Sequence, residues 1–229
     1  MATGLEIKHV YELHLVRKLF WLFFVVVLAL SVWFGYKYFE SGDLPPFVSA
    51  RSLSANNEVE QTEVSPESLR EHAVGPREPR YVTIPALGGK QFRSFSADLD
   101  DTNQLALQKN INDISWYKNS STPGIGYGVV IISGHGLGTQ GAGPFEKASQ
   151  LKTGDEIHIQ TGSGEVVQYK ISEVKVLPVQ DALTSGTKLL TASADEDKEG
   201  LNIIAPAGKW IPKYKQFDSR IIIRAIATQ

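Results

Sequence analysis

An uncharged apolar run from Leu19 to Tyr36 near the N-terminus limits the possible folds of this chain more than any other feature. At about 1.5 Å per helical residue, the run is just long enough to cross the hydrocarbon core of a bilayer. Trp21 and Trp33 lie near its two ends, where amphipathic rings favour the membrane interface. The alternatives are a cleaved signal peptide and a buried core helix. The sequence Tyr-Lys-Tyr-Phe-Glu that follows is poor for cleavage, and soluble core helices are rarely apolar on all faces. We therefore predict an uncleaved transmembrane signal anchor over residues 19–36.

Charges on the two sides of this run predict its orientation. Arg17 and Lys18 precede it, whereas Glu40 and Asp43 follow soon after it. Cytoplasmic flanks of membrane spans carry an excess of Lys and Arg. We expect residues 1–18 to be cytoplasmic and the rest of the chain to lie outside the membrane.

Composition excludes several functional classes. The net charge of the 229-residue chain is −2, so no nucleic-acid footprint is indicated. The chain has no cysteine, which rules out a disulfide, a thiolate metal site and a thiol nucleophile. Its 5 histidines have spacings and compartments that do not suit a metal site, so we expect neither a metal nor a cofactor.

The remainder divides into a spacer and a β domain. Residues 37–79 are polar and rich in proline, without a sustained period of 2 or 3.6, and predict a flexible extracellular stalk with one short helix over 65–72. Residues 80–229 carry short apolar runs separated by glycine turns, which indicate a mainly β barrel or sandwich. The expected strands are 81–84, 91–95, 129–133, 156–160, 166–171, 174–179, 189–192 and 220–227. Short helices are expected over 105–114 and 144–151.

Four landmarks in the β domain resemble the sortases, the membrane-anchored transpeptidases of bacterial cell surfaces. They follow the family order: Gly128-Val-Val-Ile-Ile-Ser-Gly-His135, with Ile114-Ser-Trp-Tyr117 before it; Gly143-Pro-Phe145 with Leu151-Lys-Thr-Gly-Asp-Glu-Ile157; Tyr169-Lys-Ile171 with Val174-Lys-Val-Leu-Pro-Val179 and Asp181; and Lys188-Leu-Leu-Thr-Ala192, followed by Ser219-Arg-Ile-Ile-Ile223. The first landmark is similar to class E and class F sortases in particular.

This resemblance implies a sortase-like closed β-barrel in a single-pass protein of the bacterial cell membrane. It also implies cleavage of a sorting-signal peptide and transfer of the product to an amine acceptor of cell-wall or pilin type. By resemblance, His135 takes the position of the catalytic acid/base and Arg220 that of the oxyanion donor, with Arg224 as a rival arginine. Thr191 and Gly134 take positions that would contact substrate.

The decisive departure from the family is the missing thiol. Aligned on Thr191, the family cysteine is replaced by Ala192, and a slip of one residue places Ser193 there. The chain is then a sortase without its nucleophile, a peptide-binding pseudo-sortase or surface scaffold, or a serine-dependent variant using Ser193. A laboratory Cys→Ala change is a further explanation, although the membrane anchor argues against it. A rival register places the family's final strand at 201–205, where no arginine precedes it. In the preferred register, the residues between Ala192 and Arg220 form a long loop.

Overall fold

A computed structural model describes residues 5–46, 48, 62–101, 103–138 and 141–228. The chain divides into two compact units, one comprising Met1–Ser49 with Ile211–Lys215 and the other comprising Ala50–Trp210 with Gln216–Gln229. The first unit contains the helix α1 (Leu5–Ser41). From His14 to Ser41, this helix is long and apolar enough to cross a membrane, and none of its most apolar stretch is buried by protein.

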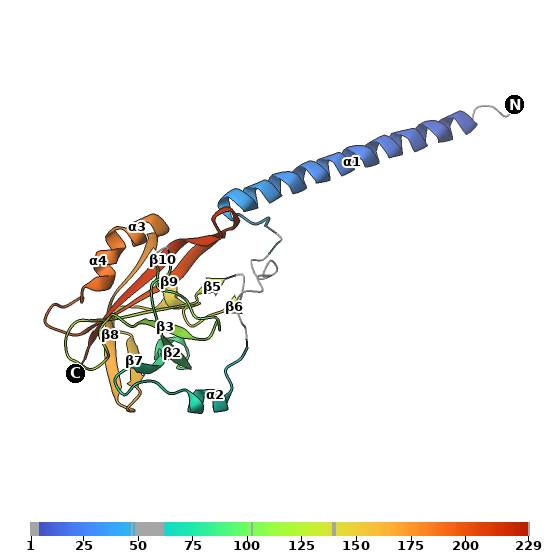
Figure 1. Cartoon of the computed structure of the whole chain (residues 1–229). Helices are drawn as coiled ribbons and strands as arrows, with labels where there is room; N and C mark the ends of the chain where they lie inside the picture. Colours follow the sequence, from blue (N-terminus) through green and yellow to red (C-terminus); the bar gives the residue numbers. More distant parts are fainter. Residues whose placement is uncertain (1–4, 47, 49–61, 102, 139–140, 229) are drawn as a thin grey trace. The chain divides into compact units, whose positions relative to one another are not determined.

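The second unit is built around a closed barrel of eight strands, as the sequence predicted (Figure 1). Its strands are β1 (Pro79–Thr83), β2 (Gln91–Ala97), β3 (Ile114–Tyr117), β4 (Val129–Gly134), β7 (Glu156–Thr161), β8 (Val166–Pro178), β9 (Gly200–Ile211) and β10 (Gln216–Ala227). A separate hairpin pairs β5 (Leu137–Gly138) with β6 (Gly141–Ala142). The helices after α1 are α2 (Pro66–Glu71), α3 (Val179–Leu183) and α4 (Ser185–Thr191), and the 3₁₀ turns are η2 (Pro85–Leu87), η3 (Ala148–Gln150) and η4 (Pro212–Tyr214).

The order around the barrel is β1-β2-β3-β4-β9-β10-β8-β7. The pairs β2–β3 and β4–β9 are parallel, while the other pairs with a defined register are antiparallel. Alternate side chains along each strand face opposite sides of a sheet. Val130, Ile132, Leu201, Ile203 and Ala205 accordingly enter the buried core. Their neighbours along β4 and β9 face the outside of the barrel.

A buried carboxylate fixes the loop that leads into β4. Glu199 is 1% exposed and accepts hydrogen bonds from the backbone N–H groups of Gly124 at 3.0 Å and Gly126 at 2.8 Å. The hydroxyl of Tyr169 on β8 donates to the same carboxylate. Burial, and then this hydrogen bond, raise the pKa of Tyr169, so the hydroxyl keeps its proton. Glu199 thereby attaches the loop to the barrel and fixes the start of the strand that ends before His135.

Several sequence expectations need correction. The helix expected over 105–114 does not form: Leu105 bridges Leu99 in an antiparallel arrangement, and the Ser115 hydroxyl donates to the Ala106 carbonyl at 2.5 Å. The strand expected at 189–192 is wrong as well, because Ser185–Thr191 forms α4. The long loop expected between Ala192 and Arg220 instead contains β9.

Other local expectations are confirmed. The helix predicted over 65–72 is α2, whose N-cap Ser65 accepts a hydrogen bond from the backbone N–H of Ser68 at 3.1 Å. The helix expected over 144–151, in contrast, is not found, and only the 3₁₀ turn η3 forms within that range.

Candidate functional site

A groove of about 650 Å³ lies on the outer face of β4, β9 and β10. Its walls also come from the 99–107 segment and from α3 and α4, which follow β8 and pack beside β10 (Figure 1). Apolar side chains dominate it, including Leu105, Leu107, Ile131, Leu190, Ile204 and Pro206. Arg220 is the one charged side chain among the described residues that line the groove.

Strand register brings His135 level with Pro206. In the parallel β4–β9 pair, Ser133 lies opposite Ile204, and β4 ends at the next residue, Gly134. Continuing the same register by two residues places His135 level with Pro206. Alternation turns Ser133 and Pro206 to the same outer face, where both line the groove, whereas His135 follows the end of β4 and is not one of the groove-lining residues. The chains are also close here: a Cβ added at Gly136 would lie 2.5 Å from the Pro206 carbonyl oxygen.

His135 is half-buried, and a neighbouring loop fixes its ring. Its Nε2 lies 2.8 Å from the Gln108 carbonyl oxygen. A carbonyl can only accept, so Nε2 carries the hydrogen and Nδ1 is the acceptor in the neutral ring. The Phe145 backbone N–H donates to the His135 carbonyl at 2.9 Å. Gly143 must lack a side chain, since a Cβ there would lie 2.5 Å from the His135 Cβ.

Arg220 is 8% exposed and lines the groove from β10. Its guanidinium donates to the carbonyls of Ser219 at 3.0 Å and Phe217 at 3.2 Å, and to the Gln104 side-chain oxygen at 3.2 Å. All three acceptors are neutral. Burial lowers the pKa of Arg220, which remains charged because arginine titrates far above neutral pH.

The sequence predicted that a strand ends at Ala192 or Ser193, beside His135. The structure has the helix α4 there instead of a strand. Ala192 caps the C-terminus of α4, and its carbonyl accepts hydrogen bonds from Asn202 at 2.9 Å and Arg224 at 3.2 Å. Ser193 lies against Gly200, at the start of β9. Six residues of strand separate Gly200 from Pro206, about 20 Å at 3.3 Å per residue. Neither Ala192 nor Ser193 therefore reaches His135.

The two predicted substrate-contacting residues differ in placement. Thr191 lines the groove. Gly134 points toward the core, where an added Cβ would lie 2.9 Å from the Phe145 ring, and it does not line the groove. The sequence analysis missed Pro206, although its alternative register at 201–205 identified the strand that carries this residue.

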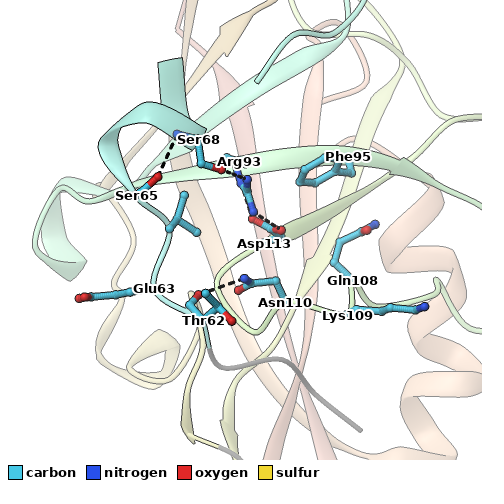
Figure 2. A pocket seen from close by; sticks show the side chains of 11 residues that line it. Thr62, Glu63, Ser65, Ser68, Arg93, Phe95, Gln108, Lys109, Asn110 and Asp113 are labelled. Carbon is cyan, nitrogen blue, oxygen red and sulfur yellow. Dashed lines mark hydrogen bonds and ion pairs between the residues drawn. The ribbon is translucent and has the colours of Figure 1, made fainter. Parts of the chain in front are cut away.

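A second cavity of about 610 Å³ lies between α2 and the barrel. Figure 2 shows Arg93 at its centre, bonded to both Asp113 oxygens at 2.9 and 2.8 Å and to the Ser68 hydroxyl at 2.5 Å. Gln108 lines this cavity while its carbonyl binds His135. In this cavity the half-buried guanidinium of Arg93 has a carboxylate partner, unlike that of Arg220. Among the described residues, no group of three or more His, Cys, Asp or Glu side chains is arranged to hold a metal ion.

Comparisons with solved structures and with protein families find similar proteins. Among solved structures, the chain is similar to a lid mutant of sortase A from Corynebacterium diphtheriae, with 19% identity, a TM-score of 0.48, and coverage of 71% of this chain and 76% of that one. It is also similar to sortase C from Clostridium perfringens with the C-terminal cell wall sorting motif, with 16% identity, a TM-score of 0.47, and coverage of 68% and 74%. A search of curated proteins finds no match. The Sortase domain family matches residues 82–226, well over half of the sequence, and the chain belongs to the sortase family.

Proposed function

We propose that this chain is a membrane-anchored, non-catalytic sortase that binds a sorting-signal-like peptide without cutting it. One observation carries the proposal. The β4–β9 register, continued past Ser133 and Ile204, sets Pro206 opposite His135, and a proline side chain has no nucleophilic atom. The groove that Pro206 lines is nevertheless present. Covalent transfer to an amine needs a nucleophile activated beside a base. Peptide binding needs only the groove.

Hydroxyl groups near the groove offer no ready substitute for the thiol. The Ser133 hydroxyl faces outward but donates to the Ile204 carbonyl at 2.8 Å, and it is 5% exposed. Thr191 donates to the carbonyl of Thr187 within α4 at 3.0 Å. A serine or threonine nucleophile requires an adjacent general base, and neither hydroxyl is hydrogen-bonded to His135.

The test combines a cleavage assay with a binding assay on the full-length protein. A library of random pentapeptides flanked by a fluorophore and a quencher is incubated with the protein, with and without glycine amide as the amine acceptor. We expect no cleavage and no transfer product by mass spectrometry. We also expect a subset of the same peptides, without the quencher, to bind by fluorescence anisotropy.

Two serine variants make the outcome decisive. Cleavage that disappears in Ser133→Ala or Ser193→Ala would replace this proposal with a serine-dependent transpeptidase. Absence of both cleavage and binding would overturn the peptide-binding function itself.

A further inference from the structure

We infer that the groove recognises peptides by their free C-terminal carboxylate, which pairs with Arg220. This inference rests on the proposed peptide-binding function and names its ligand class. It starts from a charge imbalance: Arg220 is a buried cation whose hydrogen-bond acceptors are two backbone carbonyls and one side-chain amide.

Burial of an unpaired charge is unfavourable, so buried guanidinium groups in proteins are usually paired with anions. The barrel itself illustrates the usual solution. Arg93 binds both oxygens of Asp113, and Arg224 pairs with Glu173 at 3.3 Å. Among the described residues, no carboxylate forms an ion pair with Arg220. Burial is also the cause of its lowered pKa, with no acidic neighbour acting against it.

In a sortase with a nucleophile, a developing oxyanion would supply negative charge only briefly. Pro206 removes that source of charge from this chain, because no nucleophile is present to add to a peptide carbonyl. A neutral peptide carbonyl would replace one neutral acceptor with another. A carboxylate supplies a permanent charge and matches the planar, forked donors of arginine.

The groove suits the end of a peptide. Its volume lies within the range of about 300–1,000 Å³ that is common for ligand sites. Leu105 and Leu107 on one wall and Ile204 on its floor offer apolar contacts to side chains. The Gln104 side-chain oxygen, now 3.2 Å from the Arg220 guanidinium, marks the place where a carboxylate oxygen would lie after this flexible side chain turns away.

The test uses pairs of peptides that differ only at the C-terminus. A pooled library of fluorescein-labelled random hexapeptides is synthesised both as free acids and as C-terminal amides. Peptides retained by the immobilised full-length protein are identified by mass spectrometry, and the dissociation constants of matched pairs are measured by anisotropy. We expect the acids to bind about tenfold or more tightly than their amides, since hydrogen bonds between charged groups are about twice as strong as neutral ones.

Variants then assign the preference to one residue. Arg220→Gln should abolish the difference between acid and amide, while Arg220→Lys should retain part of it. Lys188→Gln removes a positive charge from the exposed face of α4, outside the groove lining, and should leave the preference unchanged.

Each outcome has a distinct meaning. Equal binding of acids and amides by the unmodified protein overturns the carboxylate inference but leaves the peptide-binding function standing. A preference that survives Arg220→Gln also overturns the inference. Absence of binding by both series overturns the proposed function, and the inference with it.

Discussion

Pro206 is the residue on which the proposed absence of catalysis rests. It lines the same groove as Arg220, midway along β9, the strand that runs parallel to β4. A thiol at this position would have a histidine and a buried arginine nearby, and positive neighbours lower the pKa of a cysteine.

Because the chain has no cysteine, each introduced thiol is the only one present. We expect Pro206→Cys to react with iodoacetamide at pH 7 about tenfold faster than Ala192→Cys, equivalent to about one unit of pKa. Mass spectrometry of the modified protein across pH measures both rates. Equal rates in the two variants, with both folded by circular dichroism, would contradict the position assigned to Pro206.

At the scale of the element, one amide side chain connects β9 to α4. The Nδ2 group of Asn202 lies 2.8 to 2.9 Å from the carbonyl oxygens of Leu189, Leu190 and Ala192. The last carbonyls of a helix have no partner within it, so this buried amide satisfies acceptors that would otherwise be orphaned. It also holds α4, which forms one wall of the groove.

Replacing Asn202 with alanine should release α4 before it weakens the barrel. Loss of these bonds at a buried position should lower the free energy of unfolding by about 1–3 kcal/mol. Hydrogen exchange should show α4 amides losing protection while those of β7 and β8 keep theirs. Uniform loss of protection across the barrel would show that Asn202 supports the whole fold and not the groove wall.

His72 makes the stability of the barrel depend on pH. It follows α2, is 8% exposed, and its Nε2 donates to the Ser94 carbonyl at 2.9 Å. Burial is the main cause that lowers its pKa below 6.5. The Ser94 carbonyl and Asp113 act in the opposite direction, while Arg93 and Arg80 lower it further. The contribution of His72 to stability is therefore fully present above pH 6.5 and is lost as the pH falls through its folded-state pKa.

Chemical denaturation at pH 7.5 and 5.5 tests this linkage. We expect the unmodified protein to lose more stability between these two values than the His72→Gln variant loses. His158→Gln, which alters a partly exposed histidine on β7 paired with Glu156 at 3.1 Å, serves as the matched control and should behave as the unmodified protein does. Identical pH dependence in His72→Gln and the unmodified protein would contradict the role of His72.

The elements that could be predicted from the sequence were those fixed by local patterns. The strand before His135 shows a continuous apolar run after glycine turns, and α2 begins at Ser65 followed by proline. The run Leu189–Ala192 was misread, because four residues of mixed apolar character suit a strand or a helix equally well. The observed helix is bonded at its end by Asn202 on β9, and this contact between residues 13 positions apart is not contained in any local pattern.

The nucleophile position was missed for a related reason. Aligning a motif on Thr191 gave a local match, whereas the pairing of β4 with β9 depends on which distant strand lies beside His135. Arg220 was predicted as the oxyanion donor, a role that stays a prediction; it lies within β10 and lines the groove. Two of the neutral partners of its guanidinium are the nearby carbonyls of Phe217 and Ser219, whereas the third, the Gln104 side chain, lies more than a hundred residues earlier in the chain.

At the scale of the whole molecule, α1 and the barrel perform separate tasks. The side chains of α1 from Leu19 to Val27 are exposed although they are large and apolar, which is unfavourable in water and expected in lipid. The barrel buries its own core and needs no contribution from α1. The exposed apolar surface of α1 is therefore compatible with a membrane anchor.

The charged residues on either side of the apolar run in α1 predict that the N-terminus is cytoplasmic and that the barrel lies outside the membrane. Single-cysteine variants test this on intact cells with a membrane-impermeant maleimide, again without background from native thiols. Ser163→Cys, in the exposed turn between β7 and β8, should be labelled on intact cells. Thr3→Cys should be labelled only after permeabilisation, because Arg17 and Lys18 hold its side of the helix in the cytoplasm.

The labelled Thr3→Cys protein should also have the mass of the full chain, since an uncleaved anchor keeps its N-terminus. The reverse labelling pattern would overturn the orientation, and a shortened product lacking the Thr3→Cys label would show that the helix is a cleaved signal peptide.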